Sequence, residues 1–574
     1  MDAFRRVPSL TRRRVVAGGL AAAAGTAAGL RAAAAGPLPF PGMRSRRQAT
    51  PASVSELRPS LHSYPLTTEQ KTFRIMVPHY GLDWANNAFT QWYEDLTGVH
   101  IEWVVVEDEG AITQLNLQLA SGDYPDIIMG FNWGTFELTM TVIAAYGGQG
   151  IFVPLTDYLD DYAPNLRTYV IPEYPIAEKL VTMSDGQVYS LPYINDCYHC
   201  SYNAQKMWVR TSWLDTLGIA EPTTVDEFTA MLQAIRDGDP NGNGKADEVP
   251  LTASLDWPLE SYMMSPFQIT PKQPWLYLQD GKVTASYLQD GWLEGTTYLR
   301  SLVDQKLLSS EIYTQNSDQF RALGDNDRIG LAPGVVAGVF VTATDGTPGP
   351  WSDYRILSPV EGPAGRTIFR DYDESHLGNV FVVTDKCQDP ALAVAWADGL
   401  YSWEATIRSV LGSPGKNWRP AEDNEVGIDG EAARYAVIPG DPNDVNDDQD
   451  SWGQLSPSFR NAKDRLSQAV VGDREANNEV ILYEGCHEQL TPFATPEAND
   501  MLRPVFTADE AVRVSDLEKV IVDLVKQQQA LEVTGQRDPE SSRQEFLDQL
   551  RALGVEEYLS LQQGAHDRMS GASS

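Results

Sequence analysis

Basic residues are scarce in this chain. Its 574 residues include 44 lysines and arginines against 79 aspartates and glutamates, so the formal net charge is −35 and the sequence pI is about 4.5. Binding to a phosphate backbone requires a basic surface, so nucleic acid is excluded as an expected partner. The length and the 42% hydrophobic content are enough to bury large cores, and we expect two or more domains.

Cysteine is also rare, and four cysteines in so long a chain do not make a disulfide framework. Cys197 and Cys200 form a C-x-x-C pair with His199 between them. The flanking residues are β-like and do not open a helix, as the pair of a thioredoxin-like site would. We therefore expect a local disulfide or two buried thiols rather than redox catalysis. Zinc would need two further ligands, and Cys387 and Cys486 offer only distant ones.

Long apolar runs are missing after residue 35, where no segment approaches the roughly 20 apolar residues of a membrane span. Residues 1–35 carry six arginines and one acid, and the apolar run Val15–Leu30 precedes the small residues Ala32–Ala35. This pattern is typical of a cleavable export signal of the twin-arginine type; a membrane anchor is the weaker alternative because the run is short. The first cysteine is Cys197, so no lipobox is expected, and the predicted location is extracytoplasmic, in the periplasm or at the cell surface.

The most informative segment alternates oxygen-bearing residues over positions 239–248. Ca²⁺ takes about six to eight oxygens, which an EF-hand loop supplies from alternate positions around a bend glycine. Here the bend glycine is Gly244, but the twelfth position, where an EF-hand has glutamate, is Pro250. A glutamate at the end of the segment is expected to close the site early. A turn rich in Gly, Asn and Asp is the simpler alternative. The predicted Ca²⁺ ligands are Asp239, Asn241, Asn243, Lys245 (through its carbonyl), Asp247 and Glu248.

The flanks of this segment predict a loop between a helix and a strand. Thr224 and Glu227 form a capping-box pattern, and apolar residues then recur at helical spacing up to Asp237. Val249–Ala253 is β-like, and its proline cannot continue a helix. The predicted metal loop therefore departs from an EF-hand, which would continue into a second helix.

Strands and helices alternate at the start of the folded chain. Phe73–Val77, Ile101–Val106 and Asp126–Met129 read as strands, with helical periodicity between them. A βαβαβ order predicts an α/β fold with a parallel sheet covered by helices on its faces. Ligands of such sheets bind beyond the carboxyl ends of the strands.

Four segments in order resemble the extracellular solute-binding protein family 1, the sugar receptors of ABC importers: Ala120–Ile127, Gly186–Tyr193, Val209–Gly218 and Pro222–Thr252. The last resembles the subgroup of alginate oligosaccharide receptors and LipO-type lipoproteins, in which this loop holds a structural Ca²⁺. The resemblance implies a periplasmic-binding-protein-like α/β fold of two discontinuous lobes joined by a hinge.

We predict the domain boundaries from these patterns. Residues 36–69 are expected to be a flexible lead-in and residues 561–574 a flexible tail. The N-terminal lobe is expected to comprise residues 70–190 and 378–412, and the C-terminal lobe residues 191–377 and 413–560.

The sugar-contacting residues cannot be taken from the resemblance, so we select them by chemistry. A sugar site combines aromatic platforms with side chains that make several hydrogen bonds. Most tryptophans must be core, so we favour residues at predicted strand ends and crossings. The aromatic candidates are Trp84, Trp133, Tyr193, Trp257, Tyr372 and Trp418, and the polar candidates are Asp83, Asn132, Asn195, Asp256 and Asp371.

The implied function is capture of a carbohydrate, expected to be an oligosaccharide, by hinge closure and its delivery to the membrane permease of an ABC transporter. The chain is expected to be a monomer without catalytic residues. The alternative is an exported glycoside hydrolase or polysaccharide lyase, which needs two carboxylates about 5–9 Å apart. No Gly-x-Ser-x-Gly elbow, His-Glu-x-x-His motif or phosphate-binding loop occurs in the sequence. A surface adhesin that binds polysaccharide without transport is a third possibility.

Overall fold

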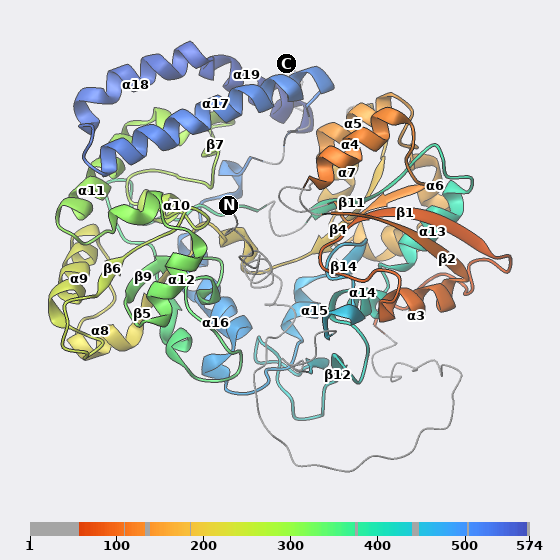
Figure 1. The fold of residues 1–574 in the computed structure, drawn as a ribbon, viewed down its shortest axis with the longest axis horizontal. Helices are drawn as coiled ribbons and strands as arrows, with labels where there is room; N and C mark the ends of the chain where they lie inside the picture. Colours follow the sequence, from red (N-terminus) through yellow and green to blue (C-terminus); the bar gives the residue numbers. More distant parts are fainter. Residues whose placement is uncertain are drawn as a thin grey trace, which may run out of the picture.

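The chain forms two α/β lobes that lie side by side in the computed structural model (Figure 1). The structure describes residues 57–107, 110–131, 138–183, 185–372, 377–438, 447–501, 504 and 506–570. The predicted export signal lies outside these residues, as do residues 36–56 of the predicted lead-in. Among the described helices, none is both long enough and apolar enough to span a bilayer.

A six-stranded sheet in the order β14-β4-β11-β3-β1-β2 forms the centre of the first lobe. β1 pairs in parallel with β2 and β3, which confirms the predicted βαβαβ unit, whereas β11 runs antiparallel to β3 and β4. The strands are β1 Lys71–Pro78, β2 Val99–Val106, β3 Ile127–Met129, β4 Ser190–Asn195, β11 Leu377–Val383 and β14 Ser458–Arg460.

Helices cover both faces of this sheet. Phe73, Ile75 and Val77 of β1 point into one hydrophobic core and Met76 into another, because successive strand side chains alternate between faces. The first core is covered by α3 (Ala88–Thr97), α6 (Thr156–Tyr162), α7 (Ile176–Val181) and α13 (Pro390–Gly399), and the second by α4 (Ala111–Ser121) and α5 (Met140–Gly148).

A four-stranded sheet in the order β10-β5-β9-β6 forms the second lobe, with a single large core. Its strands are β5 Met207–Arg210, β6 Val249–Leu251, β9 Ile329–Pro333 and β10 Tyr354–Ile356, and a separate hairpin pairs β7 Leu276–Gln279 with β8 Lys282–Ala285. Its helices are α8 Thr211–Leu217, α9 Val225–Gly238, α10 Glu260–Met263, α11 Asp290–Asp304, α12 Ser317–Asp325 and α16 Asn478–Gly485.

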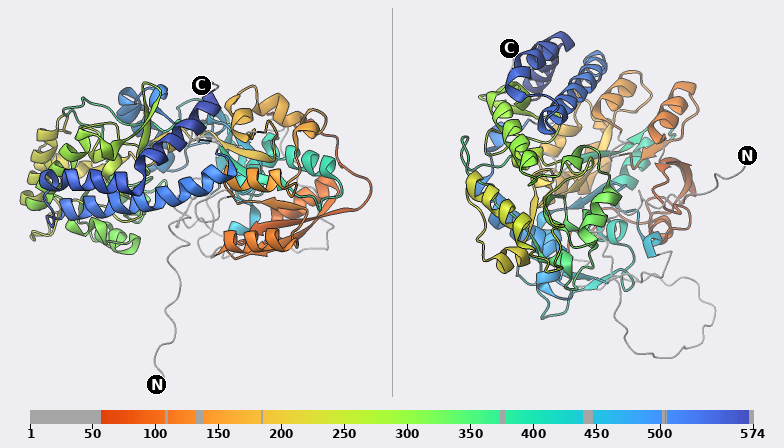
Figure 2. Two further views of the ribbon diagram at one scale, coloured as in Figure 1. Left: turned by 90° about the horizontal axis from the view of Figure 1, so that it is seen from above. Right: turned by 60° about the vertical axis from the view of Figure 1, so that its left-hand side comes forward.

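Three C-terminal helices lie along the second lobe: α17 (Ala508–Val533), α18 (Pro539–Leu553) and α19 (Val555–Ser570). α17 packs against α11 of the second lobe and also contacts α5 of the first (Figure 2). Met569 of α19 packs against the first core of the first lobe. The helix therefore continues through most of the segment that we predict to be a flexible tail, and its apolar contact with the first lobe accounts for the difference.

The predicted end of the N-terminal lobe at residue 412 is also wrong. β14 belongs to the first sheet, and Trp452 and Leu455 lie in the core of the first lobe, so the chain returns to this lobe after residue 412. A small apolar cluster packs there between α14 (Trp403–Leu411) and the hairpin of β12 (Trp418–Pro420) and β13 (Tyr435–Val437). β12, β13 and β14 have three residues each, which is too short for a recognisable periodicity.

Residues 57–69, the described part of the lead-in that we predict to be flexible, instead pack on the first lobe. Arg58 Nη2 lies 2.6 Å from Asp464 Oδ2, and His62 Nε2 lies 2.8 Å from Asp398 Oδ2. Asp398 is fully buried and also accepts hydrogen bonds from the backbone N–H groups of Asn165 (2.9 Å) and Leu166 (2.8 Å). The buried carboxylate of Asp398, at the end of α13, therefore connects residues 57–69 with the helical turn that begins at Leu166.

We expect Asp398→Asn to lower the free energy of unfolding by about 3 kcal/mol, because an amide presents one acceptor and sets N–H donors against N–H donors in a buried site. Chemical denaturation monitored by circular dichroism would measure the change. The matched control is Asp95→Asn on the exposed face of α3, which should change the value by less than about 0.5 kcal/mol. Equal effects of the two substitutions would contradict a special role for Asp398.

Candidate functional site

The predicted metal loop joins α9 to β6, so it connects a helix to a strand as its flanks predict. Thr224 is the N-cap of α9, and its hydroxyl oxygen accepts a hydrogen bond from Glu227 N at 3.2 Å. The Glu227 carboxylate accepts from the backbone N–H of Thr223 (2.8 Å), the residue before the cap. At the other end of the helix, Asp239 adopts a left-handed conformation with φ 47°, which turns the chain into the loop.

Side-chain oxygens fold the loop inward. Asn241 Oδ1 accepts from Asn243 N at 3.0 Å, Asp239 Oδ2 from Gly244 N at 3.0 Å, and Asn243 Oδ1 from Lys245 N at 2.8 Å. Each bond spans two or five residues, so alternate side chains turn toward the inside of the bend. The predicted alternation of oxygen donors therefore forms a compact turn.

The loop is attached to the residues before β9. Asn241 Nδ2 donates to Asp327 O (3.1 Å), and Arg328 Nε donates to Asp247 O (2.7 Å). The Asp247 carboxylate accepts from Asn243 Nδ2 at 3.0 Å, and this bond holds its pKa below the ordinary value for aspartate. Asp247 is therefore ionised at neutral pH.

Three carboxylate oxygens of the loop are shielded from solvent without a hydrogen-bond partner: Asp239 Oδ1 and both oxygens of Glu248. Buried carboxylate oxygens are costly unless they are hydrogen-bonded or bind a cation, so this donor set fits a hard metal ion. The loop carboxylates are nevertheless spread out. Among the described residues, the one group of three metal-ligating side chains within 4.8 Å of one another is Cys197, His199 and Cys200.

Two predicted sugar platforms are core residues. Trp84 is 1% exposed; its Nε1 donates to Pro78 O (2.9 Å), and its ring lies 4.9 Å from that of Trp103. Trp418 is fully buried, donates to Gly412 O (2.9 Å) and packs edge-on against Trp403. Neither ring has a face left for a ligand, so these two expectations are wrong. A strand end can turn an aromatic side chain inward as easily as outward.

Other candidates hold the first lobe together. Asp83 accepts from Asn86 N (3.1 Å) and Asn86 Nδ2 (2.8 Å), so it stabilises a surface turn. Tyr193 is 8% exposed, and its ring packs so closely on Gly378 that a Cβ there would lie 2.0 Å from it. Asn195, at the end of β4, accepts from Arg465 Nη1 at 3.1 Å. The remaining first-lobe candidates, Asn132 and Trp133, lie outside the described residues.

Three of the four candidates on the second lobe and on the segment before β11 keep exposed or half-buried surface, and Asp371 is buried. Asp256 is exposed and accepts from Ser317 Oγ at 2.5 Å, while Trp257 is half-buried with its Nε1 unpartnered. Asp371 is 9% exposed and lies 3.0 Å from Lys272 Nζ. Tyr372 is half-buried. These four stay predictions for ligand contact.

Arg370 is a further candidate that the sequence analysis missed. Its guanidinium lies over the Tyr372 ring, 4.4 Å from the centroid, and 5.7 Å from that of Tyr202. Its Nε is buried without a hydrogen-bond partner, and the described residues provide no ion pair for it. The sequence signal was its position directly before two candidates, Asp371 and Tyr372.

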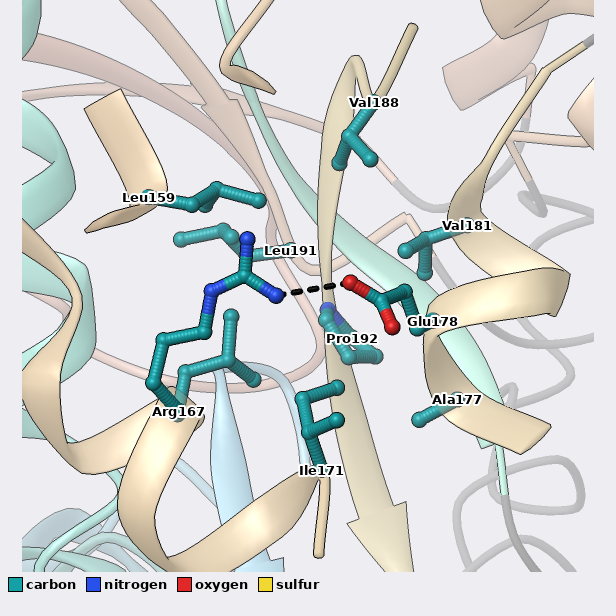
Figure 3. A pocket seen from close by; sticks show the side chains of 10 residues that line it. Leu159, Arg167, Ile171, Ala177, Glu178, Val181, Val188, Leu191 and Pro192 are labelled. Atoms are coloured by element: carbon teal, nitrogen blue, oxygen red, sulfur yellow. Dashed lines mark hydrogen bonds and ion pairs between the residues drawn. The ribbon is translucent and has the colours of Figure 1, made fainter. Parts of the chain in front are cut away.

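A narrow pocket in the first lobe does not have the chemistry of a sugar site (Figure 3). Arg167 Nη1 and Glu178 Oε1 pair across it at 2.6 Å, so its two charged groups satisfy each other. Its other lining residues are aliphatic: Leu159, Leu166, Ile171, Ala177, Val181, Val188, Leu191 and Pro192.

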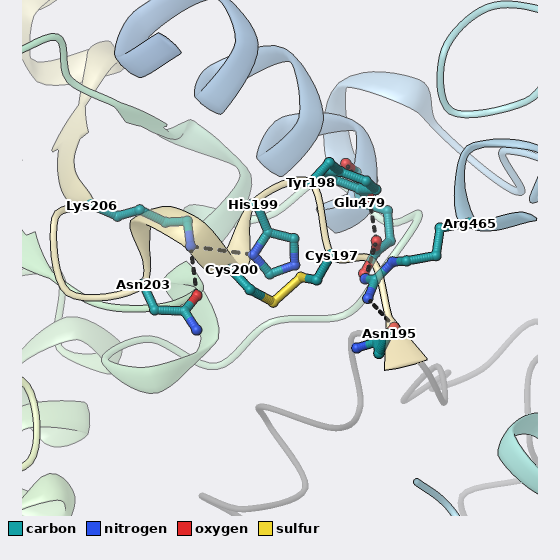
Figure 4. The surroundings of a disulfide bond; sticks show 9 residues. All are labelled: Asn195, Cys197, Tyr198, His199, Cys200, Asn203, Lys206, Arg465 and Glu479. Atoms are coloured by element: carbon teal, nitrogen blue, oxygen red, sulfur yellow. Dashed lines mark hydrogen bonds and ion pairs between the residues drawn. A yellow bond between two sulfur atoms is a disulfide. The ribbon is translucent and has the colours of Figure 1, made fainter. Parts of the chain in front are cut away.

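The C-x-x-C pair forms a disulfide, with a Cα–Cα distance of 5.2 Å, just after β4 (Figure 4). This confirms the first of the two predicted states. Both sulfurs are used by the bond, so they do not offer thiolates to zinc. Cys387 and Cys486 are buried free thiols, and burial raises the pKa of each to about 11. They are therefore poor nucleophiles at neutral pH.

Polar side chains surround the disulfide in the junction between the lobes. Figure 4 shows His199, Lys206 and Asn203 on one side and Arg465 and Glu479 on the other. Lys206 Nζ lies 3.2 Å from His199 Nδ1 and 3.0 Å from Asn203 Oδ1. Burial, and then the positive charge of Lys206, lower the pKa of His199 well below its ordinary value, so this imidazole is neutral in the fold.

The chain is similar to a protein family and to several known proteins. The profile of the bacterial extracellular solute-binding protein family matches residues 80–407, more than half of the chain. The chain is 28% identical over 364 residues to the fructooligosaccharide ABC transporter substrate-binding protein FusA of Streptococcus pneumoniae serotype 4 (strain ATCC BAA-334 / TIGR4). That alignment covers 62% of this chain and 65% of FusA, slightly less than two thirds of its length.

Two further similarities extend this result. Lipoprotein LipO of Bacillus subtilis (strain 168) is 24% identical over 391 residues, which cover 66% of this chain and 74% of LipO. The solved structure of a FusA EF-hand mutant of S. pneumoniae, in complex with fructo-nystose, superposes with a TM-score of 0.69 at 20% identity, over 88% of this chain and all of that one. The structural match supports the two-lobed fold.

We expect acid to destabilise the protein through His199. Its folded pKa is lowered, so below about pH 6.5 the unfolded chain binds a proton that the fold excludes, and stability falls by up to about 1.4 kcal/mol per pH unit from this group. Urea unfolding at pH 5, 6 and 7 should show a shallower decline for His199→Gln than for the unchanged protein. His79→Gln, a half-buried histidine outside this network, is the control and should keep the original slope. Parallel curves for all three proteins would refute the assignment.

Proposed function

Because the chain belongs to the bacterial extracellular solute-binding proteins, we propose that it captures a carbohydrate between its two lobes and passes it to the permease of an ABC transporter. The observation that carries this proposal is the pair of α/β lobes joined by crossings, together with the family match. The names of FusA and of its sugar complex support an oligosaccharide as the ligand. Members of this family bind solutes, which makes the alternative of a glycan-cleaving enzyme less favoured.

Closure would take place at the segments that pass between the lobes. The segment after β4 and the segment before β11 run side by side, since Asp371 N donates to Ser201 O at 3.0 Å and Gly378 pairs with Tyr193. A third passage follows β14 and leads to α16. A bound sugar would shift the balance between open and closed forms by its preference for the closed form.

The ligand contacts that we propose lie on the second lobe and on the crossing. Trp257 and Tyr372 offer half-buried aromatic faces, and Asp256 and Arg370 offer polar groups near them in the sequence. A pyranose or furanose ring presents C–H groups to such faces and hydroxyls to the polar groups. The cation–π contact between the Arg370 guanidinium and the Tyr372 ring would hold both side chains in place before a ligand binds.

We also propose that residues 239–248 bind a structural Ca²⁺. The loop residues that would hold it are those predicted from the sequence, and the shielded, unpartnered oxygens of Asp239 and Glu248 support the proposal. The FusA structure named as an EF-hand mutant agrees with such a site in a related receptor. When bound, the ion would neutralise the carboxylates and fix the loop between α9 and β6.

The cellular location and the oligomeric state of the protein are part of the same proposal. We propose export through the twin-arginine-type signal of residues 1–35, function outside the cytoplasm as a monomer, and retention that does not use a lipobox cysteine. The segments on which this rests are the paired arginines and the apolar run Val15–Leu30.

Calorimetric titration with oligosaccharide pools tests the function. We expect saturable binding of one class among fructooligosaccharides, neutral pyranose oligomers and uronate oligomers, with the sugars recovered intact by chromatography. Shortened sugars would establish the enzyme alternative instead.

Tyr372→Ala should weaken sugar binding by about 10- to 100-fold in the same titration, because it removes an aromatic platform. Tyr162→Ala, on an exposed tyrosine of α6, should leave the affinity unchanged.

Chelation tests the metal. With excess Ca²⁺ the midpoint of thermal unfolding should be higher than after treatment with EDTA, because an ion that binds the fold alone stabilises it by about 2.7 kcal/mol at 100 times its Kd. Asp239→Ala should abolish the difference. Asp237→Ala removes a neighbouring exposed carboxylate, which pairs with Arg236 at 2.8 Å, and should preserve it. Loss of the Ca²⁺ effect in both variants, or in neither, would contradict the assigned ligands.

A further inference from the structure

A buried arginine in β14 lacks a carboxylate partner. Arg460 is 2% exposed, and its Nη2 lies 3.2 Å from Tyr435 Oη and 3.4 Å from Gln468 Oε1. Its Nε and Nη1 have no hydrogen-bond partner, and no acidic group of the described chain pairs with it. A guanidinium stays charged in proteins, so a buried positive charge is left with two neutral oxygens.

Two buried carboxylates of this region, Glu479 and Asp464, are already paired with other arginines. Glu479 lies 3.3 Å from Arg465, and both side chains are buried. Asp464 has two partners, Arg58 at 2.6 Å and Arg434 at 3.9 Å. Among the described residues, Arg460 therefore remains a buried positive charge without a paired carboxylate, although the whole protein carries a net charge of −35.

Arg465 lies on the same side of the sheet as this unpaired guanidinium. Arg460 is directly opposite Asn195 in the register of β14 and β4, so their side chains leave the same face. Arg465 Nη1 donates to Asn195 Oδ1 at 3.1 Å, and Arg465 Nε is itself buried without a partner. The Arg465 guanidinium also lies over the Tyr198 ring, 5.2 Å from its centroid, and the Tyr198 hydroxyl donates to Glu479 (Figure 4).

We propose that Arg460, with Arg465 beside it, binds a small inorganic anion of halide size in the buried junction of the lobes. An anion there would neutralise the excess charge and accept from guanidinium nitrogens that otherwise carry the full cost of burial. The 2% exposure of Arg460 favours a single enclosed ion over a macromolecule. The inference does not rest on the proposed sugar-binding function.

The position of this site gives it a structural role. β4 leads directly into the first crossing, and Glu479 belongs to α16 of the second lobe. An anion beside Arg460 and Arg465 would therefore act at the point where charged groups of the two lobes meet.

Bromide crystallography on the full chain provides the direct test. We expect an anomalous peak in contact with the guanidinium nitrogens of Arg460 in crystals grown with sodium bromide. Density for water alone at this position, with no anomalous signal, would overturn the proposal.

A stability series gives a second readout in solution. At constant ionic strength, replacing sodium gluconate with sodium bromide should raise the unfolding midpoint of the unchanged protein by about 2–4 °C, with saturation. Arg460→Met should remove this dependence, while the control Arg551→Met, an exposed arginine of α18, should retain it. A bromide effect of equal size in all three proteins would show a general salt effect and overturn the site. The crystallographic test covers the case in which Arg460→Met fails to fold.

Discussion

The arrangement of the lobes depends on a small buried polar junction. Arg465 follows a strand of the first lobe and Glu479 lies on a helix of the second, and the two form a buried ion pair at 3.3 Å. Such a pair gives little net stability compared with apolar packing, but it is intolerant of displacement because each charge is costly when alone. The ion pair therefore determines the relative position of the two lobes more than the stability of their contact. The adjacent disulfide fixes the backbone just after β4, at the start of the first crossing.

The parts of the fold that the sequence predicts are those determined by local pattern. β1 and β2 have eight residues each, long enough for their apolar pattern to be recognised. The loop after α9 is also local, because its oxygen donors and bend glycine lie within ten residues. The hydrogen bonds that fold it inward, such as Gly244 N to Asp239 Oδ2, connect residues of the same segment. Such features need no knowledge of the rest of the chain.

The parts that the sequence does not predict depend on distant contacts. Trp84 and Trp257 both follow predicted strands, yet the first packs among Trp103 and Trp452 while the second stays half-buried. The difference comes from a segment more than 300 residues away in the chain, which no local pattern reveals. The same applies to β14, whose three residues are a strand only because β4 lies beside them. Arg370 was missed because a charged residue on a crossing has no periodic signature.

The long C-terminal helix limits how the molecule can move. α17 has 26 residues, so it is a rod about 39 Å in length that rests on α11 at one lobe and on α5 at the other. A rod attached to one body and touching a second turns a small rotation at its base into a larger displacement at its tip. Any separation of the lobes must therefore slide or lift the α17–α5 contact, so the state of that contact would report how far apart the lobes are.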